Sequence, residues 1–204
     1  MDPTWKHPFS AIVSGPSGCG KTQFTLKFID HLQHMTNPNV DKVLWCYGIY
    51  QQIFDNYPQI EFHEGLPDLK IFDGKERTLL ILDDLMSETD QRVTMIFTKI
   101  SHHRDVSVLY LTQNLFYKSK HTRTISLNAH YLVLFKNVRD STQIANLARQ
   151  MFPGSSKYMM EAFKDSTMSS FGYLLVDFRP DTDERCRLRT GIFPGDTHYV
   201  YVRK

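Results

Sequence analysis

The chain has 204 residues, of which 41% are apolar, and a formal net charge of +2 at pH 7. This size and apolar content are enough for one sizeable core with at most a small appendage, and the near-neutral charge excludes a global basic field that would attract nucleic acid. The three cysteines are odd in number and show no C-x-x-C spacing, so we expect reduced thiols without structural disulfides or zinc.

Two further classes of protein are not indicated. No apolar run approaches the roughly 20 residues that a membrane-spanning helix needs. The N-terminal residues MDPTWK lack the apolar segment of a secretory signal peptide. We therefore expect no membrane partner and an intracellular protein that is not secreted.

A glycine-rich loop follows the first strand pattern. The apolar run at residues 11–13 leads into GPSGCGKT, whose members are Gly15, Pro16, Ser17, Gly18, Cys19, Gly20, Lys21 and Thr22. This is the G-x-x-x-x-G-K-[ST] pattern, and it lies between a strand and a helix as phosphate binding requires. Glycines let backbone N–H groups surround a phosphate, and the positive end of the next helix faces the same anion. We predict that the loop binds ATP, with Lys21 on the β- and γ-phosphates and the Thr22 hydroxyl on Mg²⁺.

The chain after this loop alternates between helix and strand patterns. Apolar residues at helical spacing predict a helix that continues to Met35 and ends at residues 37–39. The expected strands are residues 42–47, 60–62, 78–82, 106–111 and 130–135. A short helix is expected at residues 49–57. Two more helices have the apolar faces Val93, Ile96, Phe97, Ile100 and Ile144, Leu147, Ala148, Met151, with Ser87 and Asp90 capping the first and Asp140 and Ser141 the second.

Strands that alternate with helices predict an α/β fold with a mainly parallel sheet sandwiched by helices. The C-terminal residues differ, because residues 172–178 and 185–189 are strand-like and a polar turn joins them. We expect a β-hairpin there, with a final strand at residues 198–202. The predicted organisation is a P-loop ATPase core over residues 1–153 and a C-terminal extension over residues 154–204, a helix plus the β-hairpin, packed on the core in the same domain.

Polar residues end two of the expected strands. The strand at residues 78–82 runs into Asp83 and Asp84. In P-loop proteins an acidic residue at the tip of a buried strand holds Mg²⁺, and this is the role predicted for Asp83. Asp84 is predicted to orient or deprotonate the attacking water, the alternative being a helix cap. Gln113 ends the following strand and is predicted to meet the γ-phosphate or its water, the alternative being a polar strand end.

The order of these motifs resembles a known superfamily. The loop GPSGCGKT, the strand LLILDD and the segment VSVLYLTQN resemble the FtsK/HerA superfamily of DNA-pumping ATPases. The segment SKHTRTISLNAHYLVLFKNVRD is similar to the genome-packaging ATPases of large eukaryotic DNA viruses of the poxvirus type, and especially to those of Polinton (Maverick) elements and adintovirus-like relatives. The resemblance covers residues 7–180. Many members carry Asp-Glu where this chain has Asp83-Asp84, which leaves the assignment of the base open.

The resemblance implies a RecA/ASCE-like P-loop NTPase core with an extra strand between the two nucleotide motifs. It also implies a homo-oligomeric ring, a pentamer or hexamer, that uses ATP to move double-stranded DNA into a capsid with a capsid or portal protein as partner. The expected location is the infected host cell, in the nucleus or a cytoplasmic virus factory, and the virion. Such rings complete the site with an arginine of the neighbouring subunit. The resemblance places it at Arg104, with Arg123 and Arg139 as rivals.

A short basic segment follows Gln113, and two functions other than DNA translocation are compatible with the motifs. Lys118, Lys120 and Arg123 follow Gln113, and three fixed cations on one loop suit contacts to DNA phosphates, a solvated basic loop being the alternative. The first other function is a P-loop kinase for a small acceptor, although no arginine-rich lid segment lies between Gln113 and Lys136. The second is a nucleotide-switched capsid assembly factor that does not translocate DNA.

Overall fold

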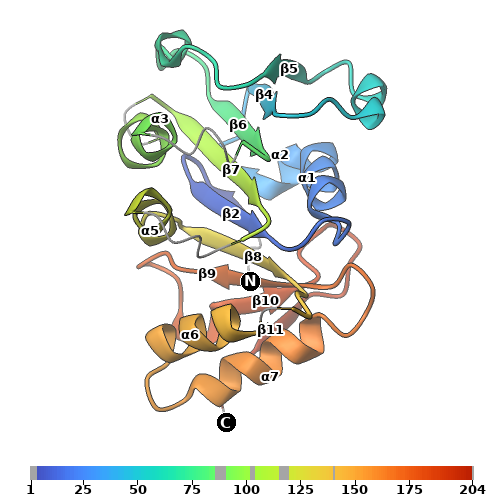
Figure 1. Cartoon of the computed structure of the whole chain (residues 1–204), viewed down its shortest axis with the longest axis vertical. Coiled ribbons are helices and arrows are strands. Elements are labelled where there is room, and N and C mark those ends of the chain that lie inside the picture. Colours follow the sequence, from blue (N-terminus) through green and yellow to red (C-terminus); the bar gives the residue numbers. More distant parts are fainter. Residues whose placement is uncertain (1–3, 86–90, 102–103, 115–119, 140, 204) are drawn as a thin grey trace.

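The computed structural model describes residues 4–85, 91–101, 104–114, 120–139 and 141–203, with only the backbone for residues 120–122. Within these residues the strands of the main sheet are β2 (Ser10–Ser14), β4 (Lys42–Tyr47), β5 (Glu61–Glu64), β6 (Thr78–Asp83), β7 (Val106–Thr112), β8 (Tyr131–Phe135), β9 (Tyr173–Asp177), β10 (Leu188–Thr190) and β11 (Tyr199–Tyr201). Their order is β11-β10-β9-β8-β2-β7-β6-β4-β5. The strands follow one another along the long axis of the molecule (Figure 1).

Helices cover both faces of this sheet (Figure 1). They are α1 (Lys21–Asp30), α2 (Leu32–Met35), α3 (Gln91–Met95), α5 (Lys120–Leu127), α6 (Thr142–Met151) and α7 (Ser156–Ser166). The π-helical turn η4 (Ile96–Ile100) continues α3, and the short 3-10 turns are η1 (Gln52–Asn56), η2 (Leu69–Ile71) and η5 (Glu184–Cys186). A separate parallel pair joins β1 (Trp5–Lys6) to β3 (Thr36–Asn37).

Two apolar clusters fill the space between the sheet and the helices. Successive side chains of β6 show how the clusters divide, because Leu79 and Ile81 pack with α1 whereas Leu80 and Leu82 pack with α3. Strand side chains alternate between the two faces, so a strand covered on both sides needs a continuous apolar run. This explains why the central strands lack a polar face.

Most of the predicted strands are confirmed, as β4, β6, β7 and β8, and β5 begins one residue later than predicted. The predicted helix at residues 49–57 is wrong, since only the 3-10 turn η1 forms there. Phe54 is the one buried side chain of that turn, whereas Ile49 and Tyr50 at the start of the predicted helix are exposed, so tertiary packing holds only the later part of the segment on the core. The helix after the glycine-rich loop is divided at His31, whose φ of −108° departs from helical geometry.

Two further local predictions need correction. Residues 120–127 form the helix α5, so Lys120 and Arg123 of the predicted basic loop lie on a helix, and the fully buried Ile125 packs this helix against the sheet. Ser141 precedes α6, but its side chain makes no capping hydrogen bond. Its φ of −76° and ψ of −15° are helical, whereas a capping side chain needs extended backbone. The other predicted caps, Ser87, Asp90 and Asp140, lie outside the described residues.

The predicted C-terminal β-hairpin is present and continues the main sheet. β9 pairs antiparallel with β8 and with β10, and β10 pairs antiparallel with β11. β10 begins at Leu188, later than predicted, because the preceding residues form the 3-10 turn η5. The predicted final strand is confirmed as β11.

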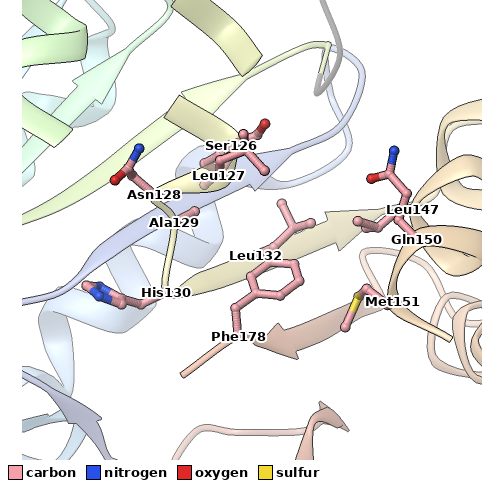
Figure 2. Close-up of a pocket in the computed structure, with 11 residues that line it drawn as sticks. Ser126, Leu127, Asn128, Ala129, His130, Leu132, Leu147, Gln150, Met151 and Phe178 are labelled. Atoms are coloured by element: carbon pink, nitrogen blue, oxygen red, sulfur yellow. The ribbon is translucent and has the colours of Figure 1, made fainter. Parts of the chain in front are cut away.

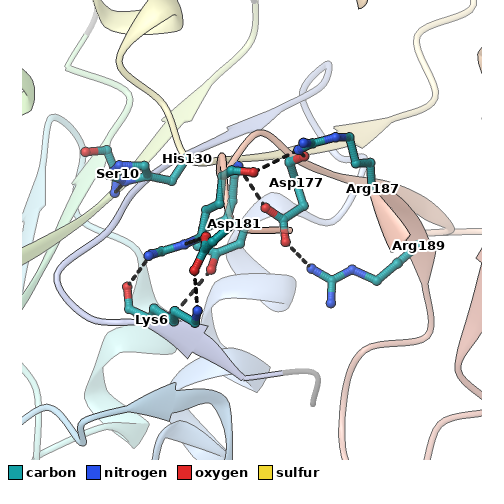
Figure 3. Close-up of polar contacts among 9 residues, drawn as sticks. Lys6, Ser10, His130, Asp177, Asp181, Arg187 and Arg189 are labelled. Atoms are coloured by element: carbon teal, nitrogen blue, oxygen red, sulfur yellow. Dashed lines mark hydrogen bonds and ion pairs between the residues drawn. The ribbon is translucent and has the colours of Figure 1, made fainter. Parts of the chain in front are cut away.

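A buried ion pair holds this hairpin together (Figure 3). Arg189 Nη2 donates to Asp177 Oδ2 at 2.6 Å, and the two side chains are 3% and 5% exposed. Arg187 Nη1 donates to the carbonyl oxygen of Asp177 at 3.0 Å. At the surface, Asp181 pairs with Lys6 of β1 and with Arg179. The N-terminal segment is therefore fastened to the C-terminal hairpin.

The buried pair predicts a large effect on stability. Asp177→Ala should lower the free energy of unfolding by about 3–5 kcal/mol, because it leaves the Arg189 guanidinium buried without its counter-charge. Urea unfolding followed by circular dichroism measures this loss. Asp181→Ala removes an exposed carboxylate from the same region and should change stability little. Equal losses in the two variants would contradict this account.

Candidate functional site

The glycine-rich loop joins β2 to α1 at the carboxyl ends of the parallel strands (Figure 1). Gly20 has a φ of 106°, a conformation that a side chain would strain, and α1 begins at the next residue. At Gly15 a Cβ atom would lie 2.7 Å from the Phe135 Cβ, so no side chain fits there. The loop is thus packed on the end of β8, and the first amides of α1 have no partners within the helix.

Lys21 lies over this loop. Its Nζ donates to the carbonyl oxygens of Gly15 at 2.7 Å and Pro16 at 3.0 Å. These bonds hold the half-buried ammonium beside the free amides of α1, next to Thr22 in the first turn. A phosphate bound to those amides therefore meets a cation that is already in place.

Strand register relates the loop to the predicted acidic site. β7 lies between β2 and β6, and Gly15 N donates to the carbonyl oxygen of Thr112 at 3.1 Å. Val13 pairs with Leu111, which in turn pairs with Asp83. With adjacent strands about 4.8 Å apart, Asp83 lies level with Val13, two residues before the loop, at roughly 10 Å across the sheet. The intervening edge is wide enough for a terminal phosphate and a metal ion.

Asp83 is a buried carboxylate at the end of β6. It is 6% exposed, and its Oδ2 accepts a hydrogen bond from Gln51 Nε2 at 3.3 Å. Burial raises the pKa of Asp83 to about 6, and the neighbouring charge of Asp84 acts in the same direction, while the Trp45 indole and the Lys21 ammonium act in the opposite one. A cation near this carboxylate would favour its charged form.

The side chains of Asp84 and Gln113 lie close together next to Asp83. Asp84 is exposed and has a φ of 52°, which turns the chain sharply at the end of β6. Its Oδ1 lies 3.5 Å from Gln113 Nε2, at the end of β7. The structure therefore brings together two predicted site residues from different strands, at the edge of the sheet that carries the loop.

Sequence reasoning missed one residue of this site, Gln51. It follows β4, which pairs with β6 in the order Tyr47 with Asp83. The segment after β4 therefore borders the carboxyl end of β6, and Gly48 N also donates to the carbonyl oxygen of Asp83 at 3.2 Å. Only the strand order carries this signal, because residues 48–51 match no motif.

The structure does not bring Arg104 to this site within one chain. Arg104 precedes β7, at the opposite end of the strand from Gln113, and its Nη1 donates to the carbonyl oxygen of Phe72 at 2.5 Å. The seven residues of β7, rising about 3.3 Å each, separate the two by more than roughly 20 Å. Its predicted action on a neighbouring subunit stays a prediction. The rival Arg139 is exposed in the segment after β8.

The predicted DNA-contact residues are only partly described. Lys118 lies outside the described residues, and Lys120 is described only in its backbone, at the start of α5. Arg123 is exposed on the same helix. Their predicted role in DNA binding stays a prediction.

The residues present fit a Mg²⁺ ion that is shared with a nucleotide. Among the described residues, no group of three or more histidine, cysteine or acidic side chains is arranged to hold a metal alone. Mg²⁺ in phosphate-binding enzymes takes one or two protein oxygens together with phosphates and water, and the Thr22 hydroxyl and the buried Asp83 carboxylate supply such oxygens. In the described part of the chain, no helix combines the length and apolarity needed to cross a membrane.

A separate apolar cavity lies away from this edge (Figure 2). It has a volume of about 390 Å³ between α5, β8 and α6, and Leu132, Leu147 and Phe178 line it. Ala129 and His130 place it at the start of β8, opposite the end that meets the glycine-rich loop. None of the predicted site residues lines it.

The fold is a mainly parallel α/β sheet with the glycine-rich loop on a central strand and a buried carboxylate two strands away, the architecture found in P-loop NTPases. The chain is similar to the genome packaging NTPase B204 from Sulfolobus turreted icosahedral virus 2. The TM-score to the complex of B204 with ATP-gammaS is 0.56 at 11% identity, over 98% of both chains. The complex of B204 with sulfate aligns at a TM-score of 0.56 and 11% identity, over 98% of this chain and 97% of the B204 chain.

A KaiC-like protein from Pyrococcus horikoshii aligns at a TM-score of 0.47 and 11% identity, over 96% of this chain and 90% of that chain. No protein-family model and no curated protein sequence matches the chain. At this level of identity, the likeness to B204 shows a shared fold.

Because Asp83 is buried, its replacement by asparagine should increase the stability of the protein by an amount that depends on pH. Because the folded state raises its pKa from 3.8 to about 6, folded protein binds this proton more tightly than unfolded protein between those values. The contribution of Asp83 to stability therefore falls as the pH rises through this window. Asp83→Asn should stabilise the nucleotide-free protein by up to about 3 kcal/mol at pH 7 and by little at pH 4.

Urea unfolding over a series of pH values measures this difference. Asp84→Asn is the matched control, because it removes the adjacent but exposed carboxylate and should show no comparable gain. A gain for Asp83→Asn that is the same at pH 4 and pH 7 would show that burial of the charge is not its cause.

Proposed function

We propose that this chain is an ATPase that moves double-stranded DNA into a viral capsid as one subunit of a homo-oligomeric ring. The observation that carries the proposal is the convergence of the phosphate loop, Asp83 and the Asp84–Gln113 pair at one edge of the sheet. The likeness to a genome packaging NTPase over 98% of the chain supports it. ATP is the expected nucleotide, since B204 forms a complex with ATP-gammaS.

The site residues divide the work of hydrolysis. The loop amides and Lys21 bind the β- and γ-phosphates and fix their position. Thr22 and Asp83 would hold Mg²⁺, which when bound neutralises charge that develops on the transferred phosphoryl group. Asp84 accepts the proton of the attacking water, and Gln113 orients that water from the end of β7. The 3.5 Å distance between Asp84 Oδ1 and Gln113 Nε2 supports this division of roles, since one water can contact two side chains that lie this close.

An arginine of the adjacent subunit completes this proposed site. Arg104 lies at the amino end of β7, so its guanidinium is too far from the phosphate loop of its own chain to act there. In a ring, the amino end of one subunit's sheet can face the nucleotide edge of the next. The arginine would then stabilise transition-state charge only when the subunits are assembled.

The proposed DNA contacts are the basic residues Lys118, Lys120 and Arg123. They follow Gln113 closely in the chain, so loss of the γ-phosphate on hydrolysis could move Gln113 and, with it, the segment proposed to bind DNA. Contacts to phosphates carry affinity without sequence preference, which suits a motor that moves any sequence. The proposed protein partner is a capsid or portal protein, in the infected cell and in the virion.

The first test is the steady-state ATPase rate with and without double-stranded DNA. The wild-type protein should hydrolyse ATP faster with DNA, and Lys21→Ala should lower the rate at least about a hundredfold because the phosphates lose their cation. Lys27→Ala is the matched control on the same helix, since Lys27 pairs with Asp196 and does not contact the loop. Its rate should match the wild type.

The outcomes separate the candidate functions. A rate that is indifferent to DNA, with Lys21→Ala inactive, would contradict the motor and favour the assembly factor that switches with nucleotide. Transfer of phosphate to an added acceptor would favour a kinase. Equal rates for wild type and Lys21→Ala would exclude the phosphate loop as the site of hydrolysis.

The arginine assignment predicts complementation between two inactive variants. Arg104→Ala should abolish hydrolysis and leave ATP binding unchanged, because the arginine acts on the neighbouring subunit's site. Mixing it with Lys21→Ala should restore part of the rate, since some interfaces then join an intact phosphate loop to an intact arginine. Arg139→Ala is the comparison, because Arg139 is an exposed arginine on another segment and the rival candidate for this role. If Arg104 is the arginine that acts, Arg139→Ala should hydrolyse ATP as the wild type does. Normal turnover of Arg104→Ala, or mixtures that stay inactive, would contradict the assignment.

A further inference from the structure

A second cavity borders the phosphate loop on the side away from Asp83 and Gln113. Its volume is about 350 Å³, and Gly18 and Cys19 of the loop form one wall. Phe135 and Lys136 at the end of β8 and residues 167–172 form the others. The cavity therefore shares the wall formed by Gly18 and Cys19 with the loop that is proposed to bind the phosphates.

Phe171 is the unusual residue of this cavity. Its side chain is 69% exposed, and its φ of 60° lies in the left-handed region that a bulky residue rarely adopts. Its Cδ1 lies 3.1 Å from the position that a Cβ would take on Gly20. Neither the exposed ring nor the strained backbone contributes to the core. Strain of this kind concentrates at sites that bind ligands.

The segment that carries Phe171 is tightly closed at its base. Gly172 N donates to the carbonyl oxygen of Ser169 at 3.1 Å, and Met168 N to that of Asp165 at 3.1 Å. A Cβ on Gly172 would lie 2.4 Å from the carbonyl oxygen of Ser166, so the backbone here is fully packed. The ring is thus presented by a rigid turn and loses little conformational freedom when a ligand binds.

The strand order gives the direction of a bound nucleotide. β6 and β7, with the acidic residues and Gln113, lie on one side of β2, and β8 and β9 lie on the other. A triphosphate whose γ end faces Asp83 and Gln113 therefore leaves the loop toward β8. The cavity beside Phe171 lies on that side of the loop, where the base at the other end of the nucleotide would be.

We propose that Phe171 is the platform on which the base of the bound nucleoside triphosphate stacks. The inference rests on the proposed binding of ATP and adds the residue that distinguishes a nucleotide from a bare polyphosphate. Stacking uses the face of the base, so Phe171 contributes affinity for ATP without selecting one base over another.

The test compares ATP with inorganic tripolyphosphate, each with Mg²⁺, by isothermal titration calorimetry. Phe171→Gly removes the ring and lets glycine adopt the positive φ without strain, so the variant should fold as well as the wild type. It should bind ATP about tenfold or more weakly, because base–aromatic stacking is lost, and bind tripolyphosphate unchanged. Tyr199→Ala removes an exposed aromatic ring on β11 and should bind both as the wild type does.

A fluorescent variant gives a second readout. Phe171→Trp should keep ATP affinity, and its added emission should be quenched by ATP but not by tripolyphosphate. Equal loss of ATP and tripolyphosphate binding in Phe171→Gly, or loss of neither, would overturn the stacking role while leaving nucleotide binding intact. If the wild type binds neither ligand, the proposed function falls and this inference falls with it.

Discussion

The parallel pairing of β2 with strands on both sides is the constraint on which the rest of the site depends. β7 holds one edge of β2 and β8 holds the other, in fixed register. All five residues of β2 are buried, so a slip by one residue would exchange its two core faces. The carboxyl ends of parallel strands meet at one edge, and the segments after β4, β6, β7 and β8 therefore border the same loop.

Because β2 lies between β7 and β8, the loop has different residues on its two sides. On the side of β7 lie the carboxylates and Gln113, which suit the reacting end of a triphosphate. On the side of β8 lie two phenylalanines, of which Phe135 packs under Gly15 and Phe171 stands exposed beside Gly20. A buried carboxylate, Asp83, and a strained aromatic residue, Phe171, lie on the two sides of the loop. The proposed binding of Mg²⁺ and a nucleotide would account for both, because a cation offsets the buried charge of Asp83 and a base stacks on the Phe171 ring.

The sequence predicted the central strands well because a strand covered on both faces needs a continuous apolar run, and runs as short as these favour a strand over a helix. It failed at residues 49–57 and 120–127, where one buried side chain, Phe54 or Ile125, decides whether and how the segment is held on the core. The cap predicted at Ser141 failed because capping depends on backbone angles that the residue type does not determine.

The sequence by itself determined the phosphate loop and the acidic strand end, because the chemistry of each resides in a few consecutive residues between recognisable elements. Only the tertiary structure decided which residues share the site. Gln51 and Phe171 come from segments far apart in the chain that match no motif, and the order of strands in the sheet brings each beside the loop or the acidic strand end. That order results from the packing of two apolar faces over the whole domain, which no local pattern contains.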